Sequence, residues 1–264
     1  MPTHAFPNTC LPQHMETPTQ AKAIPDLYAD MVLGFFPEVR ENPSIYTSWY
    51  ADYIQTFIER DIRRLINVKD TAQFQRFLSL TAGRSGQLLN IASLANDIGI
   101  SATQCNHWLT LLEQSGILYR LQPYHNNFNK RIMKSPKLYF CDTGLLCHLL
   151  HIHEEGILRT HPLVGAIVEN YAINEIRKAY LNAGKVPELY FFRDSNGHEV
   201  DLILVDGSST FAIEIKSTQT LRSELFSGLR KFQLLMPQSK PVLIYGGQES
   251  MLREGVHVLS MGRL

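Results

Sequence analysis

Three charged residues interrupt two apolar runs in the C-terminal part of the chain. Asp201 lies inside the run 200–204, and Glu214 and Lys216 belong to the run 211–216. Because side chains alternate across a strand, Glu214 and Lys216 would project from one face, and the apolar residues between them from the other. A carboxylate inside such a run costs free energy unless it is paired or binds a metal ion.

These residue types together suit phosphodiester hydrolysis. If the two runs pair as neighbouring strands, Asp201 and Glu214 come close, and a divalent cation such as Mg²⁺ or Mn²⁺ would relieve their repulsion. Lys216 beside them would orient or polarise the attacking water and stabilise charge on a phosphate. The alternative is that all three are only solvated charges on a strand face.

The segments around these residues predict a small mixed sheet. We expect helices over 163–182 and 223–235, and strands over 189–193, 199–205, 210–216, 242–245 and 256–259. Asn196-Gly197 favours a type I′ hairpin turn, which makes the first two strands neighbours. The helix between the third and fourth strands indicates a right-handed crossover and a parallel pair. The predicted order is therefore α-β-β-β-α-β, with one further strand at the end.

Asp201 and the triplet Glu214-Ile215-Lys216 resemble the PD-(D/E)xK motif of the restriction-endonuclease-like nucleases. The preceding Gly-His-Glu-Val-Asp segment, 197–201, adds to the resemblance, and Val200 stands where the motif has proline. The resemblance implies a nuclease-like fold, DNA as substrate, and Asp201 and Glu214 as metal ligands. A helix glutamate often joins the metal site in that superfamily, which implies Glu169 as a further catalytic and metal-binding residue.

A second module is predicted before this one. Its helices cover 71–82 and 91–97, a helix capped by Ser101 runs to 114, and strands follow at 117–121 and 137–140. This order is typical of a winged helix-turn-helix, with the strands forming the wing.

The charges of this module are unevenly placed. The expected recognition helix holds no lysine or arginine, so phosphate contacts would have to come from the wing. The basic residues expected to bind nucleic acid there are Arg120, Lys130, Arg131, Lys134 and Lys137. The alternative is a winged helix that only mediates protein contacts.

A broader resemblance covers the chain from about residue 30 to its end. Segments 34–39, 53–64, 138–145 and 165–170 are similar to the C-terminal part of a family of prokaryotic AAA-type ATPases. In that family an ATPase module precedes a winged helix and a nuclease-like domain of unknown function. No phosphate-binding Gly-Lys-Ser/Thr loop is found here, so we expect a truncated or split relative without ATP hydrolysis.

The predicted domain boundaries follow from these patterns. Residues 1–26, with five prolines and no periodicity, are expected to be a poorly ordered lead-in. Residues 27–70 form a linker with a long helix at 45–66, 71–150 the winged helix, and 160–264 the nuclease-like domain. The predicted fold class is α/β, or α+β, with a helical winged-helix part first and the restriction-endonuclease-like part second.

Composition limits the function classes. Lys+Arg and Asp+Glu each number 25 among 264 residues, so nucleic acid would be attracted only by local patches. No apolar run approaches the roughly 18 to 20 residues that cross a membrane, and no secretion signal is seen. The four scattered cysteines suit reduced thiols in the cytoplasm.

Three functions remain open from the sequence. The first is a metal-dependent DNA phosphodiesterase with DNA as its partner. The second is a catalytically silent nucleic-acid-binding or protein-docking module on the same scaffold, because a fold does not fix a function. The third is a scaffold or oligomerisation piece related to a larger ATPase.

Overall fold

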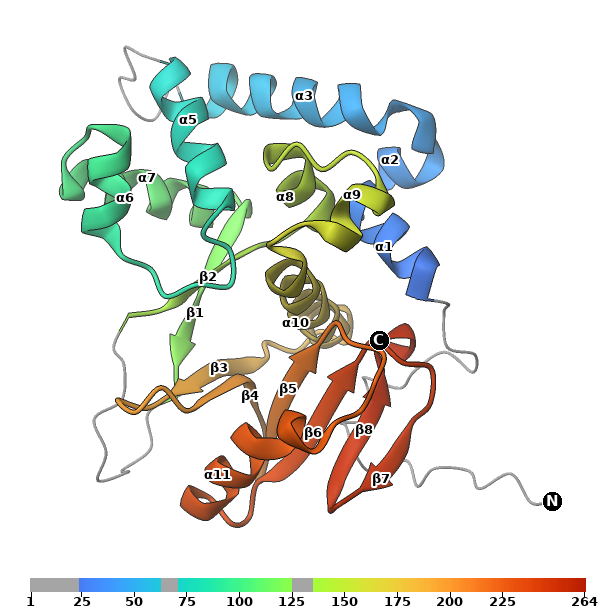
Figure 1. The fold of residues 1–264 in the computed structure, drawn as a ribbon. Coiled ribbons are helices and arrows are strands. Elements are labelled where there is room, and N and C mark those ends of the chain that lie inside the picture. The colour runs from blue at the N-terminus through green and yellow to red at the C-terminus, as the bar shows by residue number, and fades with distance from the viewer. Residues whose placement is uncertain (1–23, 63–70, 125–134) are drawn as a thin grey trace. The chain divides into compact units, whose positions relative to one another are not determined.

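The computed structural model describes residues 24–62, 71–124 and 135–264, and the chain divides into two compact units (Figure 1). The helical unit comprises residues 28–120 and 137–170. The sheet unit comprises 121–136 and 171–264, together with the residues before 28. Each unit has its own core.

Helices dominate the helical unit. In chain order its elements are α1 (Ile24–Leu33), α2 (Pro37–Glu41), η2 (Pro43–Ile45), α3 (Tyr46–Thr56), the π-helical η3 (Phe57–Ile62), α5 (Thr71–Ala82), α6 (Ile91–Ile98), α7 (Ala102–Gln114), the start of β1 (Leu118–Pro123), β2 (Lys137–Phe140), α8 (Thr143–Leu149), α9 (Glu155–Thr160) and the start of α10 (Val164–Asn182). Fully buried rings of Phe74, Phe77 and Trp108 hold α5 against α7, with ring centroids 5.0 to 5.5 Å apart. The Ser101 side chain accepts a hydrogen bond from the Gln104 amide at 3.1 Å, as the predicted cap requires.

Two expectations for the N-terminal part need correction. Helix α1 begins at Ile24, so the last three residues of the predicted lead-in are helical. The predicted helix 45–66 is α-helical only over Tyr46–Thr56 and continues as the π-helical turn Phe57–Ile62. Its remainder lies outside the described residues.

A buried carboxylate joins distant segments of the helical unit. Asp142 accepts hydrogen bonds from the amides of Phe35 and Leu145 and from the Tyr50 hydroxyl, at 2.7 to 2.8 Å. Burial, aided by the Asp142 charge, raises the pKa of Tyr50 far above its usual range, so this hydroxyl remains a donor. Gly34 has φ 78°, and a Cβ there would collide with the Tyr50 hydroxyl. The hydrogen bonds to Asp142 therefore fix the segments around 34–39 and 138–145 to one another.

The sheet unit carries most of the strands. Its further elements are β3 (Glu188–Arg193), β4 (Glu199–Asp206), β5 (Ser209–Lys216), η4 (Ser223–Phe226), α11 (Ser227–Leu235), β6 (Lys240–Tyr245), β7 (Met251–Arg253), β8 (Val256–Ser260) and η5 (Met261–Arg263). Within the described residues of this unit the strand order is β1-β3-β4-β5-β6-β8-β7. Strands β3, β4 and β5 are antiparallel neighbours, whereas β5 and β6 pair in parallel, which confirms the predicted parallel pair. The short edge strand β7 was not predicted.

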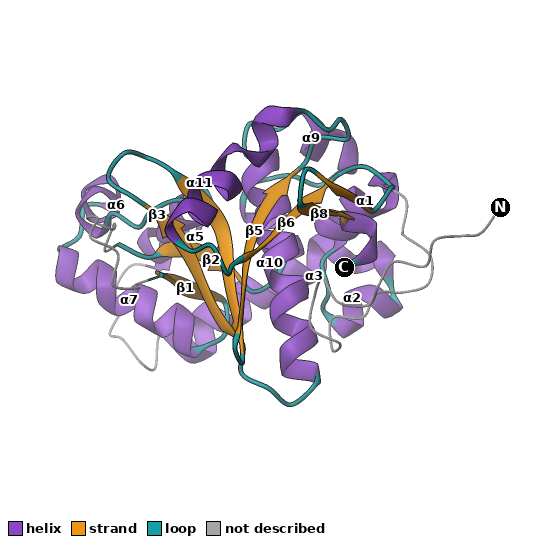
Figure 2. Ribbon diagram, turned by 90° about the horizontal axis from the view of Figure 1, so that it is seen from below, coloured by secondary structure: helices purple, strands orange, loops and turns teal. Residues whose placement is uncertain are grey.

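Helix α11 packs on one face of these strands (Figure 2). Its Leu229 and Phe232 are buried against Ile203 of β4, Ala212 of β5 and Leu243 of β6. Side chains of the opposite face, such as Phe211, Ile213 and Ile215, are also buried. Because both faces are covered, β4 and β5 read as nearly continuous apolar runs and not as alternating ones.

The hairpin between β3 and β4 was predicted in place but not in type. The Gly197 amide donates to the Asp194 carbonyl at 3.1 Å, and Gly197 has φ 81°. A type I′ turn needs positive φ at both central residues, and Asn196 is not among the residues with positive φ. The observed turn therefore has a single left-handed residue, Gly197. The Asp194 carboxylate supports it by accepting from the amides of Asn196 and His198 at 2.9 and 3.0 Å.

Candidate active site

A β-bulge lies at Asp201. Tyr190 of β3 pairs with Ile203 of β4, but Phe192 pairs with Val200, so two β4 residues, Asp201 and Leu202, lie opposite one β3 residue. A bulge breaks the alternation of side chains and re-aims the extra residue. This is why Asp201 can leave the apolar pattern of its strand and direct its carboxylate towards β5.

The Asp201 carboxylate takes the place of a strand carbonyl. The ladder between β4 and β5 runs from Leu202 opposite Ile213 to Asp206 opposite Ser209. Beyond it, the Ile215 amide donates to Asp201 Oδ2 at 2.8 Å. The bond satisfies a buried backbone donor and fixes the carboxylate beside the end of β5.

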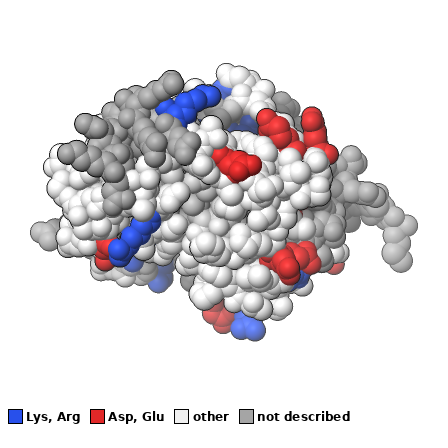
Figure 3. Space-filling model, turned by 90° about the horizontal axis from the view of Figure 1, so that it is seen from above, with Lys and Arg blue, Asp and Glu red and all other residues white. Residues whose placement is uncertain are grey.

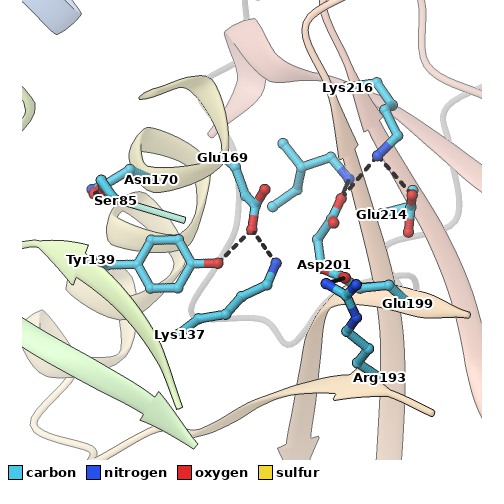
Figure 4. A network of polar contacts seen from close by, with 11 residues as sticks. Ser85, Lys137, Tyr139, Glu169, Asn170, Arg193, Glu199, Asp201, Glu214 and Lys216 are labelled. Atoms are coloured by element: carbon cyan, nitrogen blue, oxygen red, sulfur yellow. Dashed lines mark hydrogen bonds and ion pairs between the residues drawn. The ribbon is translucent and has the colours of Figure 1, made fainter. Parts of the chain in front are cut away.

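Lys216 joins the two acids (Figure 4). Its Nζ lies 3.2 Å from Asp201 Oδ2 and 2.7 Å from Glu214 Oε1. Both carboxylates are largely buried, whereas the Lys216 side chain is 35% exposed. The structure therefore brings together Asp201, Glu214 and Lys216, three of the four predicted catalytic residues.

The electrostatics of this cluster favour a charged lysine. Burial acts to lower the pKa of Lys216, but the negative charges of Asp201 and Glu214, with their hydrogen bonds, outweigh it and raise the pKa above its ordinary value. Lys216 therefore stays protonated at neutral pH and cannot serve as a general base there. The protonated Lys216 can neutralise negative charge and can orient a group that accepts a hydrogen bond from it.

The two acids fit a divalent cation. One point of positive charge already lies within hydrogen-bonding distance of an oxygen from each carboxylate, 3.2 and 2.7 Å away. No cluster of three or more histidine, cysteine, aspartate or glutamate side chains suited to a metal occurs in the described parts of the chain. A Mg²⁺ or Mn²⁺ ion here would thus have two protein carboxylates and complete its shell with water and substrate oxygens, the usual manner of Mg²⁺ binding.

Glu169 lies in the helical unit, on α10. Its Oε1 accepts from Lys137 Nζ at 3.0 Å and from the Tyr139 hydroxyl, both on β2 of the same unit (Figure 4). The next residue, Asn170, exchanges hydrogen bonds with the backbone of Phe140 at 2.8 and 2.9 Å. These contacts give Glu169 a structural role within its unit, and its place in a metal site stays a prediction.

The basic residues expected to bind nucleic acid have different surroundings in the structure. The Lys137 side chain is only 3% exposed and is paired with Glu169, and its expected phosphate contact stays a prediction. The Arg120 guanidinium donates hydrogen bonds to three residues of α7: to Glu113 at 2.9 and 2.7 Å, and to Asn106 and Thr110. Its guanidinium thus serves the packing of β1 on α7. The remaining three residues, Lys130, Arg131 and Lys134, lie outside the described residues.

Two features of the site were missed by sequence reasoning. Gly228, the second residue of α11, lies close to β4, where a Cβ would lie 2.7 Å from the Glu199 carbonyl oxygen and 3.6 Å from Glu214 Oε2. Arg193 and Glu199 form a cross-strand ion pair of 3.0 Å, and Glu199 lies on β4 shortly before Asp201. The only sequence signal for this pair is the short spacing of opposite charges across the predicted hairpin.

Charged side chains are sparse among the described residues of one face of the molecule (Figure 3). On the face drawn in Figure 3, lysine and arginine side chains are interspersed with acids, and most of the face is uncharged. None of the helices in the described residues has the length and hydropathy needed to span a membrane.

Two family descriptions match the chain. The Domain of unknown function (DUF8612) matches residues 24–156, and the Domain of unknown function (DUF4143) matches residues 164–264, which contain Asp201, Glu214 and Lys216. The chain is also 31% identical over 203 residues to Uncharacterized protein Mb2031c of Mycobacterium bovis and to Uncharacterized protein Rv2008c of Mycobacterium tuberculosis. Each alignment covers 76% of this chain and 44% of the relative, so the chain spans less than half the length of these curated relatives. No solved structure matches the chain.

Proposed function

We propose, for a chain that belongs to the family of the Domain of unknown function (DUF8612), that Asp201, Glu214 and Lys216 form the active site of a metal-dependent DNA phosphodiesterase. The observation that carries the proposal is one ammonium group shared by two carboxylates at a strand bulge. The order of α10, β3, β4, β5, α11 and β6 supports a restriction-endonuclease-like fold for the part matched by DUF4143.

Each residue has a distinct task in the proposed reaction. Asp201 and Glu214 would hold a Mg²⁺ or Mn²⁺ ion, which supplies an activated water and neutralises charge on the phosphate. The Ile215 amide fixes Asp201 Oδ2, so the ion would meet a preorganised carboxylate. Lys216, displaced from between the acids but still beside them, would orient the attacking water and stabilise the developing negative charge.

The helical unit supplies a proposed docking module. The order α5, α6, α7, β1, β2, with an antiparallel bridge between Leu88 and Lys137, supports a winged helix-turn-helix. Since Arg120 is bound to α7 and Lys137 is buried, DNA affinity from this module would depend on other residues. We therefore propose that the helical unit positions a DNA or protein partner and takes no part in catalysis.

A second candidate function rests on the same cluster. Lys216 already compensates both acids, and a raised pKa keeps it charged. A site in this closed state would be catalytically silent, and the protein would then be a nucleic-acid-binding or protein-docking module on a nuclease-like scaffold.

A cleavage assay separates the two candidates. Supercoiled, linear and single-stranded DNA are incubated with the protein in Mg²⁺, Mn²⁺ or EDTA, alongside Asp201→Ala, Lys216→Ala and the control Glu224→Ala, an exposed acid of the same unit. The phosphodiesterase proposal expects metal-dependent cleavage that falls at least about 100-fold in the first two variants and stays unchanged in the control. Cleavage that survives both substitutions would contradict it. Binding of DNA without cleavage would establish the second candidate.

A further inference from the structure

A pocket lies where the parallel strands β5 and β6 end. Lys216 pairs with Tyr245 at the last step of this ladder, and the chain leaves the two strands as the segments 217–221 and 246–249. The Gly246 amide donates to the Thr218 carbonyl at 3.0 Å, and a Cβ on Gly246 would collide with the Ser217 carbonyl oxygen. The two segments are thus held in direct contact by a residue that must be small.

The pocket between and beyond these segments has a volume of about 580 Å³. It is lined by two short segments and two residues of the edge strand: Gln219, Thr220, Leu221, Tyr245, Gly246, Gly247, Gln248, Glu249, Met251 and Arg253. Its size is that of an ordinary ligand site. One end of the pocket lies outside the carboxyl ends of β5 and β6, where ligands bind in open α/β sheets, and the other end lies at Arg253, which pairs with Val256 at the start of β8.

Arg253 gives the pocket a cation that is only weakly paired. Its Nε lies 3.8 Å from Glu254 Oε1, and its side chain is 40% exposed. Arg230 makes the close ion pair with the same glutamate. Both guanidinium groups lie 5.9 Å from the Phe226 ring, but Arg230 does not line the pocket. Arg253 can therefore offer its planar fork to a phosphate, the geometry that an arginine matches best.

The other linings suit a nucleobase. The amides of Gln219 and Gln248 and the carboxylate of Glu249 provide donors and acceptors of the kind that read base edges. Leu221 and Met251 provide apolar surface for the flat part of the same group. The pocket thus combines a cation, polar groups that can read a base edge and apolar surface. A nucleotide would contact all three, whereas a simple anion would contact only the cation.

We infer that this pocket holds a nucleotide unit of the bound DNA that lies away from the cleaved phosphate, with the phosphate of that unit on Arg253. The inference rests on the proposed function, because one end of the pocket is formed by the segments that follow Lys216 and Tyr245, so a DNA strand bound at Lys216 would continue into it. It adds a binding subsite of defined chemistry, a single DNA nucleotide, and names Arg253 as its anchoring residue.

Binding in the absence of metal tests this subsite without cleavage. A fluorescein-labelled single-stranded DNA hexamer is titrated with the whole chain in EDTA, and its anisotropy is followed. Arg253→Gln should weaken binding about tenfold, because a hydrogen-bonded charge contact is lost. Arg230→Gln, the matched control, should stay within about twofold of the wild type. Gln248→Ala, which changes no charge, should weaken binding about threefold.

The outcomes separate the subsite from the reaction. Unchanged binding in Arg253→Gln, equal losses in both arginine variants, or no binding of the hexamer by the wild type would overturn the subsite. Selective loss in Arg253→Gln would establish it even if no metal supports cleavage, in which case only the proposed reaction fails. Cleavage by Arg253→Gln at the wild-type rate and with the wild-type KM would leave the reaction in place and remove the subsite. Thermal unfolding of each variant shows whether a loss reflects binding or misfolding.

Discussion

The molecule contains two glutamate–lysine pairs of similar length but opposite surroundings. Glu214 and Lys216 lie 2.7 Å apart in the sheet unit, and Glu169 and Lys137 lie 3.0 Å apart in the helical unit. The Lys216 side chain is 35% exposed, whereas the Lys137 side chain is 3% exposed. The exposure of the lysine, and not the pairing itself, decides whether another cation can replace it beside the glutamate.

The surroundings show what each pair can do. Glu169 also accepts from the Tyr139 hydroxyl, so its pair lies in a small buried network that folding must keep complete. Lys216 shares two carboxylates and reaches solvent, so its ammonium can move aside and leave both acids to another cation. A buried pair of this type contributes to structure, and an accessible one can contribute to function.

The largest expected effect comes from breaking the buried pair. Glu169→Gln removes the negative charge beside the buried Lys137 ammonium, and the free energy of unfolding should fall by about 3 kcal/mol. Glu214→Gln, the matched change in the accessible pair, should cost under about 1 kcal/mol because Lys216 keeps Asp201 and solvent. Urea unfolding of both variants measures the difference. Equal losses would show that the two pairs do not differ as described.

A smaller effect is expected where α11 approaches the accessible pair. Gly228→Ala brings a Cβ to 2.7 Å from the Glu199 carbonyl oxygen, so α11 must shift, at a cost of about 1 to 2 kcal/mol. The shift should also disturb Glu214, which lies 3.6 Å from that Cβ, and lower any metal-dependent cleavage. Gly156→Ala, a helical glycine with open space around its Cβ position, is the control and should be neutral or slightly stabilising. Wild-type stability and cleavage in Gly228→Ala would contradict this packing.

The smallest expected effect is on the pH dependence of stability. The pKa of Lys216 is raised in the folded state above its unfolded value of about 10.4, so its stabilising contribution is complete below that pH and is lost as pH rises through the folded pKa. The stability advantage of the wild type over Lys216→Met should therefore be constant from about pH 7 to 9 and shrink above about pH 10.5. Because Lys216 is partly exposed, the change should be at most about 1 kcal/mol. Chemical unfolding across this range measures it, and an advantage that does not vary with pH would refute the assignment.

Much of the sheet unit could be predicted because its signals are local. The runs around Asp201 and Glu214, the glycine at 197 and the helix before β6 fix the order of strands and the parallel pair. The turn type failed because Asn-Gly is compatible with more than one hairpin, and the Asp194 carboxylate here stabilises another. The bulge could not be foreseen, because a strand buried on both faces has no alternation for an extra residue to interrupt.

The helical unit shows the limit of reasoning from charge patterns. Lys137 belongs to a basic run in the sequence, and nothing local indicates that its partner, Glu169, lies 32 residues further along. Arg120 likewise finds Glu113 on the preceding helix. Burial and long-range pairing depend on the assembled fold, so a basic segment predicts a nucleic-acid surface only after its partners are known.

Titration of Mn²⁺, followed by the loss of its free electron-paramagnetic signal, tests the central claim most directly. We predict one Mn²⁺ site, whose affinity falls at least about tenfold in Asp201→Asn and in Glu214→Gln. We also predict tighter Mn²⁺ binding in Lys216→Ala, because the ammonium of the wild type competes for the same two carboxylates. Mn²⁺ binding that is undetectable in the wild type, or equally strong in Asp201→Asn, would contradict the assignment of this cluster as a metal-dependent active site.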